Sequence, residues 1–160
     1  MWTLMSSPVG DLRVVENDGA ITQIEFSPFR DGDGRPRGER DDEHPVLVEA
    51  CRQLAAYFER DLKEFDLPLA PVGSAFQQKV WEQLRGIEYG ETASYGEIAA
   101  RLGMTNAASR AVGLANGRNP IPIVIPCHRV LAKAGIGGYS GTGGLATKRH
   151  LLALEGALLC

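Results

Sequence analysis

The stretch SYGEIAARLGMTNAASRAVGLANGRNPIPIVIPCHRVL, residues 94–131, holds two short helical patterns and then a hydrophobic run that ends in a cysteine. The first pattern begins at Ser94, where Glu97 three residues later fits a capping box, and it stops at Gly103. The second covers residues 105–117. Two short helices joined by a tight glycine-containing turn are typical of a helix-turn-helix, although many small helical folds contain such a pair.

The second helix of this pair is built almost entirely from small residues. Ala111 and Gly113 are examples, and Arg110 is the one long side chain in the first two turns. Small residues let a helix backbone approach another surface closely. That surface is either a neighbouring helix or the groove of a nucleic acid, with Arg110 as the projecting side chain. The pattern alone leaves both interpretations open.

The cysteine that follows stands between a proline and a histidine. A structural cysteine favours apolar neighbours, whereas a reactive one needs positive charge or a base nearby to hold it as the thiolate. Cys127 is followed by His128 and Arg129, and prolines at positions 120, 122 and 126 stiffen the approach to it. The pattern therefore indicates a reactive cysteine.

Toward the C-terminus, a glycine-rich loop leads into a last helix. The segment AKAGIGGYSGTGG, residues 132–144, holds six glycines and predicts a loop that a backbone or ligand could approach closely. In GLATKRHLLALEGA, residues 144–157, leucines at helical spacing predict the helix, with Glu155 near its end.

Toward the N-terminus, the sequence predicts a further helix and a linker. Ser74 can cap a helix over residues 75–87, whose apolar residues share one face. Residues 66–73 contain two prolines and break the periodicity, so we expect them to link two halves of the chain.

The first half of the chain is predicted to form a hairpin, a loop and a helix. Apolar and polar residues alternate on either side of Asp18-Gly19, a dipeptide that favours a tight hairpin. Residues 28–45 are rich in glycine, proline and charge, and predict an exposed loop with almost nothing to bury. Residues 46–60 have helical spacing, with Cys51 inside the apolar pattern.

The charge is distributed unevenly between the two halves. Residues 1–73 contain 8 Lys and Arg against 15 Asp and Glu, whereas residues 74–160 contain 9 against 5. The whole chain has a net charge of −3, yet its second half is basic. This asymmetry favours contact between the second half and a polyanion, unless it reflects only chance and an acidic loop.

Composition places the chain among globular proteins of the cytoplasm. With 160 residues, 44% hydrophobic and 23% charged, it can form one domain or two small ones. No apolar run approaches the roughly 20 residues of a membrane helix, and the N-terminal segment lacks the features of a secretory signal. Cysteines at 51, 127 and 160 suggest neither a disulfide framework nor a metal site. We therefore expect a cytoplasmic protein with no cofactor, no metal and no membrane partner.

Two motifs together resemble one family. The segment RAVGLANGRNPIPIVIPCHRVL, residues 110–131, followed by GYSG and GGLATKRHLLALEG, resembles the 6-O-alkylguanine-DNA alkyltransferases, also called methylated-DNA–protein-cysteine methyltransferases. The Pro-Cys-His-Arg-Val core, the family's signature, is intact at residues 126–130. The resemblance is strong over residues 74–156 and holds only in outline over the first 70.

The resemblance implies an α+β fold with two domains. Residues 1–68 would form an N-terminal domain with a small antiparallel sheet and a helix, similar to ribonuclease H. Residues 74–160 would form a mainly helical domain with a winged-helix-like helix-turn-helix that binds DNA and transfers the alkyl group. Lys148 and Arg149 match basic positions of the family's last helix, where they would balance charge.

The resemblance also implies suicide repair by a monomer that binds double-stranded DNA containing 6-O-alkylguanine. Such proteins dock their helix-turn-helix in the minor groove, whereas most helix-turn-helix proteins use the major groove. Ala111 and Gly113 would allow the close approach, and Arg110 matches the finger that replaces the extruded nucleotide. Tyr95 matches the tyrosine that helps to rotate the base out of the stack.

The family's chemistry maps onto residues near Cys127. Cys127 would attack the alkyl carbon in one in-line displacement, with a relay through a water to His128 and then Glu155. Tyr95 would donate a hydrogen bond to the departing guanine.

Four further residues match the family's pocket. Asn119 would order the loops around the cysteine, and the Val130 carbonyl would bind the guanine amino group. Tyr139 would wall the pocket, and the Ser140 N–H would bond the oxygen that carries the alkyl group. The loop at 135–143 departs in length from commoner family loops, which bears on the size of alkyl group accepted.

Three other functions remain open from the sequence. A DNA-binding relative could flag alkylated bases without repairing them, although such proteins replace the cysteine. A cysteine hydrolase could use Cys127 and His128 on a small acyl substrate and would turn over repeatedly. A helix-turn-helix regulator would need no Cys-His pair.

Overall fold

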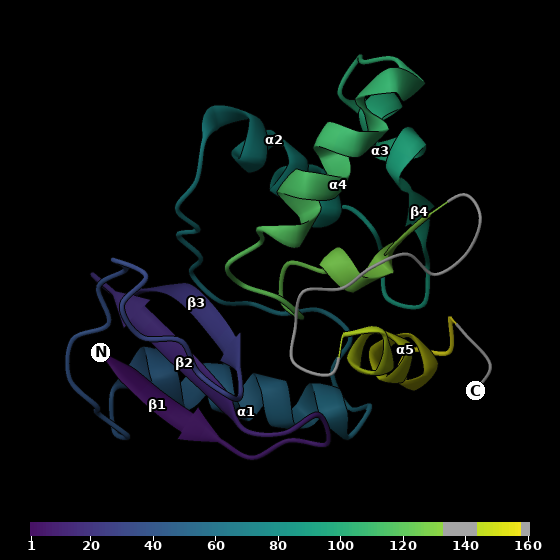
Figure 1. The fold of residues 1–160 in the computed structure, drawn as a ribbon. Helices are drawn as coiled ribbons and strands as arrows, with labels where there is room; N and C mark the ends of the chain where they lie inside the picture. The colour runs from purple at the N-terminus through teal and green to yellow at the C-terminus, as the bar shows by residue number, and fades with distance from the viewer. Residues whose placement is uncertain (133–143, 158–160) are drawn as a thin grey trace. The chain divides into compact units, whose positions relative to one another are not determined.

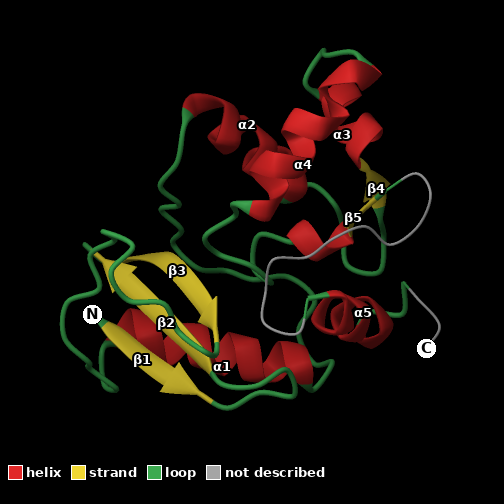
Figure 2. Ribbon diagram, viewed as in Figure 1, coloured by secondary structure: helices red, strands yellow, loops and turns green. Residues whose placement is uncertain are grey.

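The computed structural model describes residues 1–132 and 144–157, and the chain divides into two units, Met1–Pro71 and Val72–Cys160. Figure 1 labels the elements of both units, and Figure 2 separates helices from strands by colour. Within the described ranges, no helix is long and apolar enough to cross a membrane.

The first unit is a three-stranded antiparallel sheet with one helix. Strands β1 (Trp2–Met5), β2 (Leu12–Asn17) and β3 (Ala20–Phe26) lie in that order, and α1 spans Pro45–Phe58. The predicted hairpin is confirmed, because Asp18 and Gly19 connect β2 to β3 with φ values of 53° and 82°. Positive φ at both positions is what the commonest two-residue hairpin turn requires.

Apolar side chains of β2 and β3 gather on one face of the sheet. Leu12 lies opposite Phe26 and Val14 opposite Ile24, and all four side chains are buried. Helix α1 packs against both strands with its own buried face, which consists of Leu47, Ala50, Leu54 and Tyr57 together with Gln53. The intervening residues of β2 and β3 point to the opposite face of the sheet.

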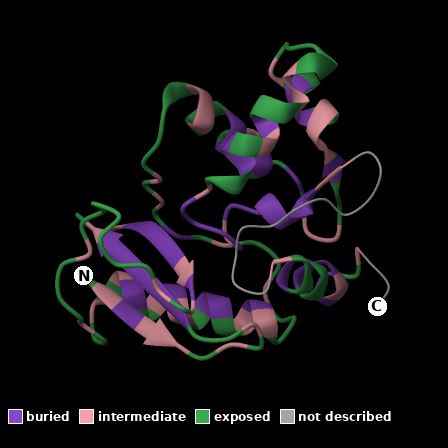
Figure 3. Ribbon diagram, viewed as in Figure 1, coloured by how far each residue is buried: buried purple, intermediate pink, exposed green. Residues whose placement is uncertain are grey.

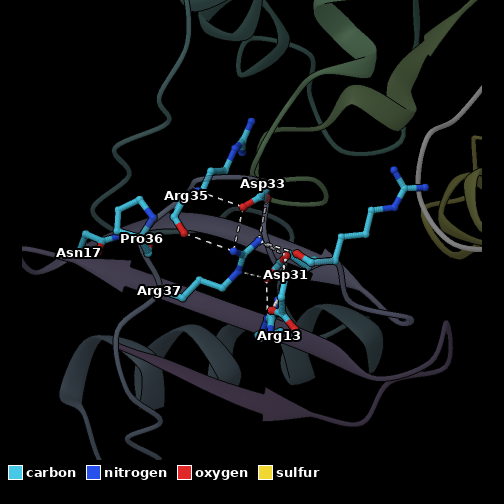
Figure 4. A network of polar contacts seen from close by, with 9 residues as sticks. Arg13, Asn17, Asp31, Asp33, Arg35, Pro36 and Arg37 are labelled. Carbon is cyan, nitrogen blue, oxygen red and sulfur yellow. Dashed lines mark hydrogen bonds and ion pairs between the residues drawn. The ribbon is translucent and has the colours of Figure 1, made fainter.

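That opposite face binds the loop between β3 and α1 through ion pairs (Figure 4). Arg37 bonds Glu25 at 2.7 Å and Asp33 at 2.8 Å, and Arg13 bonds Glu25 at 2.6 Å. The prediction that residues 28–45 have almost nothing to bury is therefore wrong for Arg37, whose side chain is only 10% exposed. Two carboxylates offset its charge, so ion pairs help to hold the loop on the sheet.

The second unit is mainly helical, and its first helix begins as predicted. Ser74 and Gln77 form a reciprocal capping box at its start. The elements run in the order α2 (Ala75–Leu84), β4 (Ala93–Ser94), α3 (Tyr95–Arg101), η1 (Asn106–Ala108), α4 (Ser109–Gly117), η2 (Cys127–Arg129), β5 (Val130–Leu131) and α5 (Leu145–Leu154).

Helices α3 and α4 form the predicted helix-turn-helix. Ser94 caps the start of α3. At its end, the N–H groups of Gly103 and Met104 bond the carbonyl oxygens of Ala100 and Ala99, with Gly103 at φ 74°. This pair of bonds satisfies the last carbonyls of the helix and requires a residue that tolerates positive φ. Glycine at this position therefore sets where α3 stops and the turn begins.

Close packing fixes the helices of the second unit to one another. The indole Nε1 of Trp81 in α2 donates to the Ala115 carbonyl in α4 at 2.9 Å. A side chain at Gly96 would place its Cβ 2.5 Å from Oδ1 of Asn106, so glycine permits α3 to approach η1. Figure 3 shows buried residues in each of α2, α4 and α5.

Candidate active site

Two short strands bring the start of α3 beside the segment that contains Cys127. Strand β4 pairs in parallel with β5, with Ala93 opposite Val130. Tyr95 follows β4 directly, and Cys127 begins η2, which directly precedes β5. Burial raises the pKa of Tyr95, and the charge of Cys127 raises it further. The tyrosine and the cysteine are thus part of one site.

The proline-rich approach to Cys127 is made of two three-residue turns. The first is centred on Ile123, at φ 74°, and is closed by a 2.9 Å bond from the Val124 N–H to the Pro122 carbonyl. The second is centred on Pro126 and is closed by the N–H of Cys127. A three-residue turn with a left-handed centre is rare and strained. The run therefore fixes the backbone at the cysteine.

Two asparagines hold the loops around Cys127. Asn119, expected from the resemblance to order these loops, donates to the Ile125 carbonyl at 2.7 Å and accepts from the Ile121 N–H at 3.0 Å. Asn116 of α4, which the sequence did not single out, is buried and donates to the Cys127 carbonyl at 3.2 Å. This hydrogen bond connects α4 directly to η2.

The residues that follow Cys127 join Glu155 in a buried cluster. Nε2 of His128 lies 2.7 Å from Oε2 of Glu155, and Arg129 bonds both carboxylate oxygens at 2.8 and 3.0 Å. Arg129 also donates to the Ile87 carbonyl at 2.6 Å. Cys127 is 5% exposed and His128 is wholly buried. The cluster fixes the position of the imidazole that follows Cys127 in the chain.

The electrostatics of the cluster determine where the protons lie. Burial lowers the pKa of His128, and the hydrogen bond to Glu155 only partly opposes this effect. Burial alone would raise the pKa of Glu155, but hydrogen bonds from His128 and Arg129 lower it to about 2. The imidazole is therefore neutral and donates Nε2–H to an ionised carboxylate. Its Nδ1, which bonds none of the described residues, is the basic nitrogen.

Helix α4 turns a face of mostly small residues to the surface. Arg110 and Ala111 are exposed, Gly113 is half-buried, and Leu114 is 66% exposed. A Cβ at Gly113 would lie 3.8 Å from the ring of Tyr95, so the helix passes close to that ring. The arrangement presents one long cation, Arg110, on a surface that can approach another molecule closely.

The structure adds a residue that the sequence did not single out, and it does not reach two that were predicted. Tyr139 and Ser140 lie outside the described residues. Asn116 gave no local signal, because its role depends on a contact with a distant segment. Lys148, which the resemblance assigned to charge balance, is buried and donates to the Val130 carbonyl. In the described ranges, no group of three or more His, Cys, Asp or Glu could hold a metal ion.

Comparison with known proteins decides the family. Residues 75–157 match the family described as 6-O-methylguanine DNA methyltransferase, DNA binding domain, and residues 1–71 match the ribonuclease-like domain of the same proteins. The chain belongs to this family. The family predicted from the sequence and its α+β fold are both confirmed.

Individual members of the family resemble the chain over nearly its whole length. The methylated-DNA–protein-cysteine methyltransferase of Mycolicibacterium paratuberculosis is 47% identical over 158 residues, which cover 94% of this chain and 89% of that protein. The protein of the same name from Methanosarcina acetivorans is 43% identical over 157 residues, 98% of each chain.

Solved structures of a family member show the same fold. The O6-methylguanine methyltransferase of Mycobacterium tuberculosis has a TM-score of 0.88 at 41% identity, covering 99% of this chain and 94% of that one. A crystal structure of Mycobacterium tuberculosis OGT in complex with DNA has a TM-score of 0.79 at 42% identity, covering 98% and 92%.

Proposed function

We propose that this protein repairs DNA by direct reversal of damage. It binds duplex DNA in the minor groove, flips out a 6-O-alkylguanine base and transfers the alkyl group irreversibly to Cys127. The observation that carries the proposal is the buried cluster of His128, Glu155 and Arg129 next to Cys127, joined through Asn116 to an exposed helix of small residues. Membership of the family supports it, as does the complex of a relative with DNA.

The second unit is proposed to carry both DNA binding and chemistry, with domains at residues 1–68 and 74–160. Residues 74–160 contain 9 Lys and Arg against 5 Asp and Glu, so their charge suits a phosphate backbone. The exposed face of α4 includes Arg110, Ala111 and Leu114, and its mostly small side chains would allow close approach to a minor groove. Binding should depend little on sequence and should weaken with salt, because released counterions drive it.

Arg110 and Tyr95 are proposed to move the base. The alkylated oxygen cannot be reached within a stacked duplex, so the nucleotide must rotate into a pocket at a cost of a few kcal/mol. Arg110 would fill the gap in the stack, and α4 passes close to the Tyr95 ring at Gly113. Tyr95 would then donate a hydrogen bond to the guanine as it leaves.

Transfer to Cys127 is a single displacement. Nδ1 of His128 accepts the thiol proton through a water, while Glu155 accepts Nε2–H and stabilises the imidazolium that forms. The thiolate attacks the alkyl carbon, a carbon–sulfur bond forms, and the carbon–oxygen bond to guanine breaks. The departing guanine takes up a proton. The thioether product has no leaving group, so each molecule acts once.

The other predicted residues complete the pocket in this proposal. Asn119 orders the loops, and the Val130 carbonyl binds the guanine amino group. Tyr139 walls the pocket, and the Ser140 N–H bonds the oxygen that carries the alkyl group. The protein is proposed to act as a monomer in the cytoplasm and to need no cofactor.

Stoichiometry tests this function. We expect the protein, given excess duplex DNA containing 6-O-methylguanine, to remove one methyl group per molecule and then stop. Continued removal would contradict a suicide transferase and would favour a hydrolase that uses the same thiol. Tight binding without any removal would instead indicate a protein that only flags the lesion.

A further inference from the structure

Leu114 is a large apolar side chain at the centre of the exposed face of α4. Exposed residues recur at helical spacing through η1, α4 and its C-cap, at positions 107, 110, 111, 114, 117 and 118. The other five positions hold alanine, glycine or arginine, whereas the side chain of Leu114 is 66% exposed. A single exposed leucine is common on protein surfaces, so its role depends on its surroundings.

The opposite side of α4 keeps Leu114 pointing outward. Ala115 and Asn116 are buried there. The indole Nε1 of Trp81 donates to the Ala115 carbonyl at 2.9 Å, and the Asn116 amide donates to the Cys127 carbonyl at 3.2 Å. Because α4 is bonded to two other segments, it presents Leu114 to the outside on a fixed backbone.

The charges around Leu114 indicate which partner would cover it. Arg110 and Arg118 lie four residues before and four residues after it, so all three share one stripe of the helix. None of the six exposed positions described above is acidic. Two copies of the chain meeting through this face would bring four arginines together, whereas a nucleic acid would neutralise them. The stripe therefore fits DNA better than a second copy of the chain.

A leucine in a minor groove meets base pairs that differ by one group. An A·T pair presents only acceptors there, and a G·C pair adds the 2-amino donor of guanine. Leucine cannot accept a hydrogen bond, so covering that amino group would leave a donor without a partner, which is costly. Acceptors lose water at both kinds of pair, so the amino group makes the difference. Leu114 would thus favour pairs that lack it.

The spacing along α4 limits which base pairs Leu114 can reach. Four residues separate it from Arg110, which corresponds to about 6 Å along the axis at about 1.5 Å per residue. Successive bases of one strand are about 3.4 Å apart. With Arg110 in the gap left by the extruded nucleotide, Leu114 would lie within about two base pairs of that gap.

We infer that Leu114 is a specificity-determining residue for the duplex reaction, which favours lesions whose neighbouring base pairs have no amino group in the minor groove. The inference rests on the proposed docking of α4 in that groove. It adds a local preference for A·T neighbours to phosphate binding, which does not depend on sequence.

Modified bases test the amino group directly. Methyl transfer is measured at subsaturating protein from duplexes in which each of the two base pairs on either side of 6-O-methylguanine is varied in turn. Hypoxanthine·C, which lacks the amino group, is compared with G·C, and 2,6-diaminopurine·T, which has it, is compared with A·T. We expect the amino group to slow transfer about fivefold at one or more of these positions, the effect of one buried donor left without a partner.

Variants of Leu114 assign the preference to this side chain. Leu114→Met keeps an apolar side chain of similar volume and should keep the preference. Leu114→Ala removes the contact, and Leu114→Asn supplies an amide oxygen that can accept from the amino group, so neither should disfavour it. Val48→Asn is the matched control, because Val48 is a 50% exposed apolar residue of α1 in the first unit, and it should leave the preference unchanged.

Equal rates for the paired duplexes at all four positions would overturn the inference. A preference retained in both Leu114→Ala and Leu114→Asn would overturn it too, because the stability of the base pairs would then be the cause. Dissociation constants of Cys127→Ser for the same duplexes give the preference without chemistry. Failure of methyl transfer on every duplex would therefore contradict the proposed function, while the binding ratios would still decide the role of Leu114.

Discussion

Nε2 of His128 lies 2.7 Å from Oε2 of Glu155, and both side chains are wholly buried. Because Arg129 bonds the same carboxylate, Glu155 stays ionised and keeps the proton of His128 on Nε2. Nδ1 is thereby left as the base. This one contact connects the last helix to the chemistry at Cys127.

Replacing Glu155 by Gln should slow alkyl transfer by up to about 10⁴-fold, the loss seen when a carboxylate that orients a catalytic histidine becomes an amide. The amide cannot hold the imidazole in the required tautomer or stabilise its charged form. Single-turnover transfer from duplex DNA measures the effect, with the exposed Glu82→Gln as a matched control. A normal rate in folded Glu155→Gln would remove Glu155 from the relay.

Lowering the pH should reduce the contribution of Glu155 to the free energy of unfolding. Burial alone would raise its pKa, but hydrogen bonds from His128 and Arg129 lower it from 4.5 to about 2. A carboxylate with a lowered folded-state pKa stabilises the fold above its unfolded value and loses that effect as the pH falls. The difference in free energy of unfolding between the unmodified protein and Glu155→Gln should therefore shrink from pH 4.5 toward 2. Urea titrations measure it, and a constant difference would count against the ionised pair.

Arg110→Ala should impair repair of duplex DNA far more than transfer from a free alkylated base such as 6-O-benzylguanine. Only the duplex reaction requires extrusion, which costs a few kcal/mol. Since each 1.4 kcal/mol is about a factor of ten, we expect a ten- to thousandfold loss on duplex. Parallel single-turnover assays compare the two substrates, after the unmodified protein is shown to react with the free base.

Arg118→Ala is the matched control for Arg110→Ala, because Arg118 is an exposed arginine at the end of the same helix. Loss of a general phosphate contact should weaken binding and reduce its salt dependence without the same selective loss on duplex. Equal damage to duplex and free-base reactions in folded Arg110→Ala would mean that Arg110 is not the finger.

Local patterns were sufficient to predict much of the fold. Asp18-Gly19 specifies the hairpin because few residues tolerate positive φ at both turn positions. Ser74 and Ser94 specify helix starts because their hydroxyls accept backbone N–H groups. The pairing of β4 with β5 could not be predicted in this way, since strands of two residues have no periodicity.

The site was predictable only in part, for a related reason. Cys127 and His128 are adjacent in the sequence, and the resemblance pointed to Glu155. Asn116 and Lys148 bond backbone carbonyls of segments far along the chain, which no local pattern encodes. A buried lysine also contradicts the general preference of its residue type, so the burial of Lys148 could not be predicted from the sequence.

The intact mass of the protein after incubation with duplex DNA containing 6-O-methylguanine tests alkyl transfer to Cys127 most directly. We expect a gain of one methyl group, located at Cys127 by peptide mapping, in the unmodified protein and in Cys51→Ser and Cys160→Ser. Cys127→Ser should bind the same DNA and gain nothing. A methyl group on any other residue, or a full gain in Cys127→Ser, would mean that Cys127 is not the nucleophile.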